Sequence, residues 1–190
     1  MAASEVPRDA FPSLTRMTGN GAEIGIRDAS NADLPAMAAI LNDEIAASAF
    51  VYAEDPVTVD ERRAWLASHR AGDFPVLVAF DVTAPDTPLG WASLSPYRGS
   101  SGYRFTAEAS VYVARSARRR GVAAELLGAL IDAPSAERFH AFAASIDAEN
   151  APSIALFERF GFSEAARLRE VGRKFDEWRT QLLYVRLRTT

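Results

Sequence analysis

Residues 118–131 read RRRGVAAELLGALI, and this stretch decides which kind of fold the chain adopts. Apolar side chains recur at helical spacing from Val122 to Ile131 and predict a helix over these residues. The first N–H groups of a helix have no partner within it, and its N-terminus carries partial positive charge. Arginines directly before such a terminus are unfavourable unless an anion binds there, and the small Gly121 and Ala123 allow a phosphate to approach. The stretch therefore predicts a diphosphate-binding turn, with a solvated basic turn as the alternative.

The segments on both sides of this turn predict a mixed α/β protein. Apolar runs predict seven strands, near residues 24–27, 74–80, 89–94, 103–113, 139–146, 167–171 and 181–187. Helical spacing predicts four helices, near residues 34–45, 59–71, 122–131 and 150–160. Residues 81–88 contain two prolines and predict a turn. The order is one strand, two helices, three strands, a helix, a strand, a helix and two strands, which is typical of a sheet with helices on its faces.

Local signals predict several helix ends and one helix surface. Ser30 followed by Asp33 is close to a capping box. Gly161 is well placed to end the last helix. Arg62 and Arg63 are interpreted as part of a solvated helix face.

Length and composition limit the classes of protein. With 190 residues, 48% of them hydrophobic, the chain fits one domain, which we place at 23–190 after a flexible tail at 1–22. The net charge of −4 argues against a nucleic-acid partner. Without cysteine and with two histidines, disulfides and cysteine- or histidine-rich metal sites are excluded, and we expect no metal. We expect no membrane partner and a cytoplasmic location, because no long apolar run or signal segment is present.

A second motif follows the basic turn. A strand ends at Asp147, Asn150 and Ser153 open the next helix, and the run 160–162, Phe-Gly-Phe, closes it. This succession resembles the acetyl-CoA-binding core of the GCN5-related N-acetyltransferase (GNAT) superfamily over about residues 24–187. The resemblance implies the GNAT acyl-CoA N-acyltransferase fold, with a mixed, mostly antiparallel sheet of six or seven strands and about four flanking helices.

Residues 106–113, TAEASVYV, narrow the resemblance to one branch of that superfamily. They are similar to the signature strand of the phosphinothricin and methionine sulfoximine N-acetyltransferases, and residues 97–98 and 103–105 resemble that branch's substrate segment. The resemblance implies an enzyme that transfers an acetyl group from acetyl-CoA to the free amine of a small amino-acid-like substrate. Because no cysteine or obvious serine–histidine pair can carry the acyl group, we expect direct attack in a ternary complex.

Glu108 is the candidate catalytic residue. An amine is protonated at neutral pH, and a carboxylate on a strand that faces the substrate can take its proton, directly or through water. The resemblance places the general base at this glutamate. The alternatives are a surface carboxylate or a structural partner of Arg104.

The resemblance also assigns the residues that bind the cofactor and the substrate. Cofactor contacts, many of them from backbone groups, fall on Val111, Tyr112, Val113, Arg118, Arg119, Arg120, Gly121, Val122, Ala123, Ala124, Asn150 and Ser153. For Asn150 a plain helix cap is the alternative. Tyr97, Arg98 and Arg104 are the substrate-binding candidates, since an arginine fork matches a two-oxygen anion. For Arg98 a solvated loop charge is the alternative.

Four positions depart from the pattern of the branch. Phe157 stands where many members of the superfamily have a tyrosine general acid. Arg179 and Thr180 stand in place of a histidine–aspartate pair, and Ser100 replaces a second arginine of the substrate segment. These departures question phosphinothricin itself as the substrate, and they leave the transfer chemistry intact.

Two other functions stay open. The acceptor amine can belong to a protein N-terminus, a polyamine or an aminoglycoside, although Arg98 and Arg104 favour an anionic substrate. The chain can also be a non-catalytic acyl-CoA-binding module, which Phe157 and the missing histidine–aspartate pair would suit. Because the family is commonly dimeric, we expect a homodimer.

Overall fold

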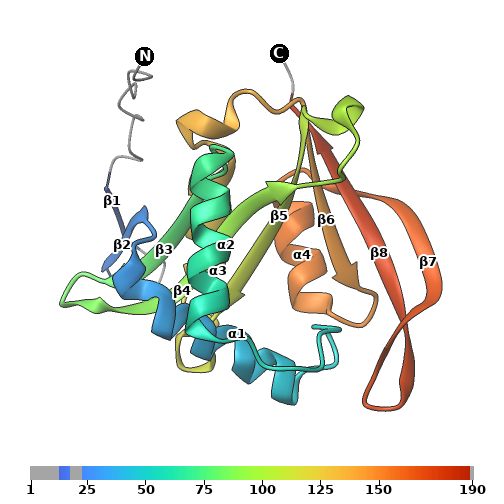
Figure 1. The fold of residues 1–190 in the computed structure, drawn as a ribbon, viewed down its shortest axis with the longest axis horizontal. Helices are drawn as coiled ribbons and strands as arrows, with labels where there is room; N and C mark the ends of the chain where they lie inside the picture. Colours follow the sequence, from blue (N-terminus) through green and yellow to red (C-terminus); the bar gives the residue numbers. More distant parts are fainter. Residues whose placement is uncertain (1–12, 18–22, 189–190) are drawn as a thin grey trace.

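The computed structural model describes residues 13–17 and 23–188 and shows a mixed α/β sheet with helices on both of its faces (Figure 1). The sheet has eight strands in the order β1-β2-β3-β4-β5-β6-β8-β7. The strands are β1 (Leu14–Met17), β2 (Glu23–Asp28), β3 (Val76–Asp81), β4 (Ala84–Pro96), β5 (Thr106–Val113), β6 (Ala141–Asp147), β7 (Ser163–Lys174) and β8 (Glu177–Leu187). The helices are α1 (Leu34–Ala47), α2 (Val59–Ala71), α3 (Val122–Ile131) and α4 (Ala151–Arg159).

The expected class and order of elements are confirmed, and one strand is added. The sheet has eight strands instead of six or seven because Leu14–Met17 pairs antiparallel with β2. This strand lies within residues 1–22, where a flexible tail is expected. Residues 1–12 and 18–22 of that segment lie outside the described residues.

Several strand boundaries differ from the predicted ones. β4 begins at Ala84, although a turn is expected up to Pro88, because register shifts around Phe80 let the proline-containing segment join the sheet. β5 begins at Thr106 because residues 101–103 form a short 3-10 turn. β7 is much longer than predicted. Most of its side chains are exposed, so its sequence carries no apolar alternation that would mark its length.

Two apolar clusters cover the two faces of the sheet. On the α3–α4 face, α3 and Phe157 of α4 belong to the same cluster as Ala107 and Ala109 of β5. On the α1–α2 face, α1 and α2 pack with Trp91 of β4 and with Tyr112 of β5. Alternate residues of β5 therefore face opposite sides of the sheet, as its sequence predicts.

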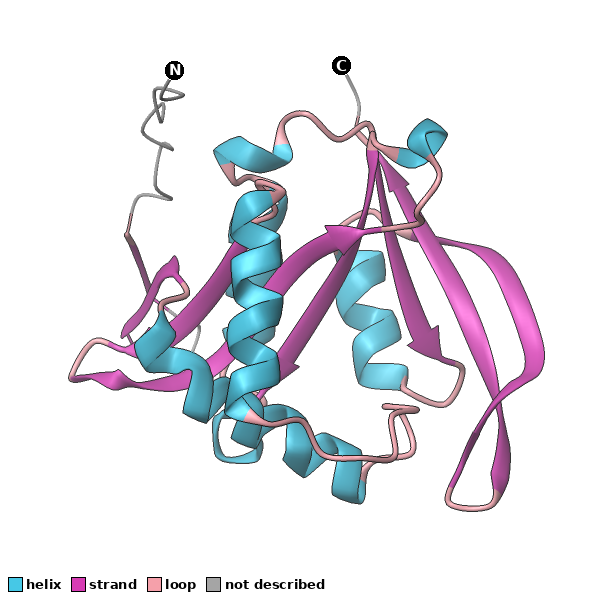
Figure 2. Cartoon of the chain, in the orientation of Figure 1, coloured by secondary structure: helices cyan, strands magenta, loops and turns pink. Residues whose placement is uncertain are grey.

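The pairing between β5 and β6 is short, and it leaves an opening between the two strands. These two strands run parallel, whereas every other pair of neighbouring strands among the described residues runs antiparallel. Three residue pairs form the pairing of β5 with β6, and it ends at Glu108 with Ala143. Beyond this point the two strands diverge, and Figure 2 shows α4 in the opening between them. β5 stays paired with β4 up to Val113, so its other edge faces the opening.

The predicted capping box forms at a short 3-10 turn, Asn31–Asp33, that leads directly into α1. The Ser30 side chain and backbone N–H both donate to the Asp33 carboxylate, at 2.8 and 2.7 Å. Arg27 donates two further hydrogen bonds to it. Burial acts to raise the pKa of Asp33, but the hydrogen bonds from Arg27 and Ser30 outweigh it and hold this pKa below its usual value.

Arg62 of α2 is buried, which corrects the expectation of a solvated face at this position. Only 6% of Arg62 is exposed, whereas the side chain of Arg63 is 52% exposed. The Arg62 guanidinium carbon lies 3.6 Å from the centre of the Trp65 ring and 4.7 Å from that of Trp91. These cation–π contacts offset part of the cost of removing the charge from water.

Within residues 13–17 and 23–188, no helix combines the length and the apolar character that crossing a membrane requires.

Candidate active site

A cavity of about 860 Å³ occupies the opening between β5 and β6. Five segments line it: the end of α1 with the loop that follows, the second half of β5, the turn into α3 with its first residues, the end of β6, and the start of α4. The lining thus brings together parts of the chain that are about 100 residues apart. A cavity at diverging strand ends and helix starts is a common place for a small ligand.

Most of the predicted cofactor residues line this cavity. They are Val111, Tyr112, Val113, Arg118, Arg119, Gly121, Val122, Ala123, Ala124, Asn150 and Ser153. Arg120 instead turns toward the end of β3, where its Nη2 atom lies 3.4 Å from the carboxylate of Asp81. Among the three arginines of the basic turn, Arg118 and Arg119 are therefore the two in the lining.

The turn into α3 has the backbone shape that an anion site needs. Arg119 and Gly121 both have left-handed backbones, with φ of 59° and 84°. Gly121 is the N-cap of α3, and no side chain caps the helix there. The first helical bonds come from Ala124 and Glu125, which donate to the Gly121 carbonyl. The N–H groups at the very start of α3 therefore lie ahead of the hydrogen-bonded turns, and they adjoin the cavity.

Asn150 is a helix cap that also belongs to the cavity lining. Its side chain accepts a hydrogen bond of 3.2 Å from the Ser153 N–H, so it caps α4, and it also lines the cavity. Phe157, about two helical turns after Asn150, lines the cavity as well. It is 3% exposed and meets the Phe162 ring edge to face at 5.0 Å between ring centres.

Glu108 lies at the point where β5 and β6 separate. Its carboxylate accepts a hydrogen bond of 2.7 Å from the Ser145 hydroxyl of β6, and Ser145 is part of the cavity lining. Glu108 itself is not part of this lining; it reaches the cavity through Ser145. Its hydrogen-bond partner is thus Ser145 and not Arg104, which was the structural alternative.

The three substrate-binding candidates lie outside the cavity lining, in one segment of the chain. The Arg98 guanidinium carbon lies 5.1 Å from the Tyr97 ring centre and 5.7 Å from that of Tyr103. The Arg104 guanidinium lies over the Phe105 ring at 4.4 Å. All of them belong to the segment between β4 and β5, next to the end of β5 that is remote from Val113. The structure brings Tyr97 and Arg98 together with Tyr103, whereas Arg104 contacts its neighbours in sequence, the Phe105 ring and the Ser101 carbonyl. Along β5, Glu108 lies between this segment and the residues from Ala109 onward that line the cavity.

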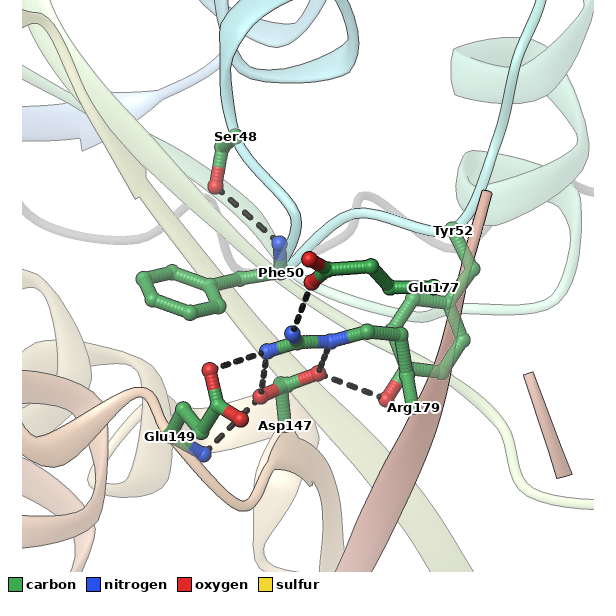
Figure 3. A network of polar contacts seen from close by, with 7 residues as sticks. All are labelled: Ser48, Phe50, Tyr52, Asp147, Glu149, Glu177 and Arg179. Atoms are coloured by element: carbon green, nitrogen blue, oxygen red, sulfur yellow. Dashed lines mark hydrogen bonds and ion pairs between the residues drawn. The ribbon is translucent and has the colours of Figure 1, made fainter. Parts of the chain in front are cut away.

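A polar network around one buried ion pair was not predicted from the sequence. Arg179 of β8 donates two hydrogen bonds to Asp147 at the end of β6, of 2.9 and 2.8 Å, and each residue is 4% exposed (Figure 3). Arg179 also contacts Glu149 at 2.9 Å and Glu177 at 3.5 Å, and the Tyr52 hydroxyl donates to Asp147 at 2.9 Å. We call these five residues the Asp147 network. Two features of the sequence could have pointed to this network. Arg179 departs from the pattern of the phosphinothricin and methionine sulfoximine branch, and Asp147 stands at the end of a predicted strand.

Charge pairing within the network shifts the pKa values of its members. Burial acts to raise the pKa of Asp147, but hydrogen bonds from Arg179, Tyr52 and the Glu149 backbone hold this pKa below its usual value. Burial and the hydrogen bond to Asp147 raise the pKa of the Tyr52 phenol. Asp147 therefore stays ionised and Tyr52 stays protonated at neutral pH.

No group of three or more histidine, aspartate or glutamate side chains with the geometry of a metal site occurs in the described part of the chain.

Comparison with known proteins adds four similarities: one family model, one relative and two solved structures. A family model described as an acetyltransferase (GNAT) domain matches residues 23–163. An L-methionine sulfoximine/L-methionine sulfone acetyltransferase of Pseudomonas aeruginosa is 40% identical over 153 residues, which are 80% of this chain and 88% of that protein. A structure described as ribosomal-protein-alanine N-acetyltransferase from Brucella melitensis is 40% identical with a TM-score of 0.81, covering 85% of this chain and 98% of that one. A phosphinothricin acetyltransferase from Sinorhizobium meliloti, solved in complex with AcCoA, is 26% identical with a TM-score of 0.79, covering 85% and 86%.

Proposed function

This chain belongs to the GNAT family and is an acetyl-CoA-dependent N-acetyltransferase, and we propose that its acceptor is the free amine of a small amino-acid-like compound. The relative that acts on methionine sulfoximine and methionine sulfone supports this acceptor class. The observation that carries the proposal is the position of Glu108. It lies where β5 and β6 begin to separate, and it accepts a hydrogen bond from Ser145, a residue of the cavity wall. The enzymatic relatives argue against a non-catalytic acyl-CoA-binding module.

The proposed reaction is a direct transfer in a ternary complex. The neutral amine nitrogen attacks the thioester carbonyl carbon, a C–N bond forms, the C–S bond breaks, and coenzyme A leaves as a thiolate. The nitrogen carries a positive charge once the C–N bond has formed, and the proton that it then loses passes through water to the thiolate. Glu108 accepts the proton that the ammonium group must lose, directly or through a water molecule. The absence of cysteine from the sequence supports a path without an acyl-enzyme thioester. Phe157 cannot donate a proton, and a thiolate whose thiol has a pKa of about 8.5 can be protonated by water.

The cofactor would lie across the opening, with each part against groups that suit it. The start of α3 offers backbone N–H groups to the diphosphate, and Arg118 and Arg119 add positive charge there. The edge of β5 that β6 leaves uncovered, from Ala109 to Val113, suits the amide-bearing pantetheine arm as an added strand would. This placement points the thioester toward Glu108.

A thiol-release assay over a panel of amines tests the acceptor class. The panel contains methionine sulfoximine, methionine sulfone, phosphinothricin, free amino acids, spermidine, an aminoglycoside and a peptide that begins with alanine. We expect the sulfoximine and the sulfone to be acetylated with a kcat/KM at least about tenfold above that of the polycations, because Arg98 and Arg104 favour an acceptor that carries an anion. A preference for spermidine or the aminoglycoside would contradict the proposal.

A protein N-terminus is the second candidate acceptor, and one specific observation favours it. The Brucella melitensis structure, which is 40% identical, is described as a ribosomal-protein-alanine N-acetyltransferase. If the alanine peptide is acetylated with a higher kcat/KM than every free amino acid of the panel, this acceptor replaces the first.

We also propose that the enzyme works as a homodimer in the cytoplasm, in a single domain that spans residues 23–190. Several apolar side chains of β7 and β8 are exposed, among them Val171 at 56% and Trp178 at 63%, and a second copy could cover them. The net charge of −4 supports the expectation that nucleic acid is not a partner. Light scattering should give twice the 20.6 kDa of one chain, and a mass of one chain at micromolar concentration would contradict the dimer.

A further inference from the structure

We infer that Arg179 is a positioning residue for the acceptor amine, because it fixes the loop that forms one wall of the active-site cavity. This loop joins α1 to α2 and comprises residues 48–58. The inference rests on the proposed function, in which an amine enters next to Glu108. It concerns residues that the transfer chemistry does not use.

The first part of the α1–α2 loop is a cavity wall. Residues 48–51 line the cavity, and the Phe50 N–H donates to the Ser48 hydroxyl at 3.1 Å (Figure 3). The far end of the loop is held independently, because the Asn42 side chain exchanges two hydrogen bonds with the Val57 backbone, of 2.9 and 2.8 Å. Between these points the loop depends on contacts with distant parts of the chain.

The hairpin of β7 and β8, together with the end of β6, supplies those contacts, and they converge on Tyr52 and Ala53. Lys174, which is 3% exposed, donates from Nζ to the Ala53 carbonyl. The Tyr52 ring packs against Gly172 so closely that a Cβ atom at Gly172 would lie 2.5 Å from a ring carbon. The Tyr52 hydroxyl donates to Asp147, whose carboxylate is held in turn by Arg179. Arg179 therefore acts on the loop through Asp147 and Tyr52.

The Asp147 carboxylate uses all of its acceptor positions for hydrogen bonds within the chain. One oxygen accepts from Arg179 Nη2 and from the Glu149 N–H, and the other accepts from Arg179 Nε and from the Tyr52 hydroxyl. A carboxylate has about four acceptor positions, so none is left for a substrate ammonium group. Although Asp147 lines the cavity, its role is structural, and this distinguishes it from Glu108.

The network acts on the acceptor side of the cavity. Phe142, Ala144 and Ile146 of β6 point to the α3–α4 face, where they belong to the larger core cluster. Ser145 and Asp147 alternate with them and point to the α1–α2 face. Glu108, the hydrogen-bond partner of Ser145, reaches that face too, whereas the predicted diphosphate site lies at the start of α3. A loosened loop should therefore weaken binding of the amine and leave binding of acetyl-CoA unchanged.

Two variants test the inference, with a control on the same hairpin. Tyr52→Phe removes one hydroxyl and keeps the ring against Gly172, and Arg179→Leu removes the charge that holds Asp147. Arg173→Leu is the control, because Arg173 is an exposed arginine of β7 that pairs with Asp176 at the surface. We expect Tyr52→Phe to raise the KM for the amine about fivefold, the value of one hydrogen bond, with kcat within about twofold and the KM for acetyl-CoA unchanged. Arg179→Leu should have a larger effect of the same kind, and Arg173→Leu none.

Hydrogen exchange provides a readout that needs no substrate. Amides of residues 48–53 should exchange faster in Tyr52→Phe than in the wild type or in Arg173→Leu, while those of α3 are unchanged. Unchanged exchange in the loop would overturn the inference even if the amine is identified. An equal rise of KM for both substrates, or a lower kcat with unchanged KM values, would overturn it too. If no amine of the panel is acetylated but the loop exchanges faster, the proposed acceptor class fails and the role of Arg179 in holding the loop stands.

Discussion

Glu108→Gln is expected to lower kcat by about 100-fold or more, because the amide can occupy the same space but cannot accept the proton of the ammonium group. The Ser145 hydroxyl can still donate a hydrogen bond to the amide oxygen, so the local packing is kept. The measurement is thiol release at saturating amine and acetyl-CoA, with the KM for acetyl-CoA and the melting temperature determined in parallel. The lost activity should recover partly at high pH, where more of the amine is already deprotonated.

Glu164→Gln is the matched control for this variant. Glu164 is a carboxylate of β7 that pairs with Arg167 at the surface, away from the cavity lining. Its replacement removes the same charge from the chain and should leave kcat within about twofold, since exposed ion pairs contribute little. Turnover like that of the wild type in Glu108→Gln would remove Glu108 from the role of base.

Gly121→Ala should raise the KM for acetyl-CoA about tenfold or more. Gly121 has a φ of 84°, a conformation that costs an alanine about 1–2 kcal/mol. It also lines the cavity at the helix start where the diphosphate is expected, so a larger side chain there competes with the diphosphate for space. Loss of one charge-assisted hydrogen bond there, about 1.5–3 kcal/mol, corresponds to about a tenfold change or more in affinity. Calorimetric titration with coenzyme A measures the affinity without any acceptor amine.

Gly161→Ala separates backbone strain from binding. Gly161 ends α4 with a φ of 80°, almost the same as that of Gly121, and a Cβ added there meets no atom within 4 Å. Both variants should therefore lose a similar free energy of unfolding, and only Gly121→Ala should bind coenzyme A less well. A similar loss of affinity in both variants would mean that the effect comes from stability and not from the anion site.

The parts of the fold that could be predicted are those encoded in neighbouring residues. The helix over Val122–Ile131 and the cap at Asn150 follow from short-range spacing and hydrogen bonding, and both appear in the structure. The alternation along β5 likewise places Glu108 and Tyr112 opposite the alanines of the core. Such signals need only the period of a helix or a strand and the chemistry of one side chain.

The parts that escaped prediction depend on contacts between distant residues. Asp147 and Arg179 are 32 positions apart, and β8 brings them together only because it lies beside β6 in the sheet. Arg62 is a charged residue of a helix, so its sequence suggests an exposed side chain. In the structure it is buried against Trp91, which belongs to β4. Tertiary packing decides such cases, and no window of local sequence contains the partner.

Because β5 and β6 pair over three residues only, the sheet consists of two parts, β1 to β5 and β6 to β8, that are joined along one short edge. Beyond Glu108, β5 and β6 form no further backbone pairs that would connect these two parts. A ligand bound along that gap contacts both parts of the sheet. Its binding free energy therefore adds to the free energy of unfolding of the protein. Occupancy by the acyl donor and resistance to heat should accordingly rise and fall together.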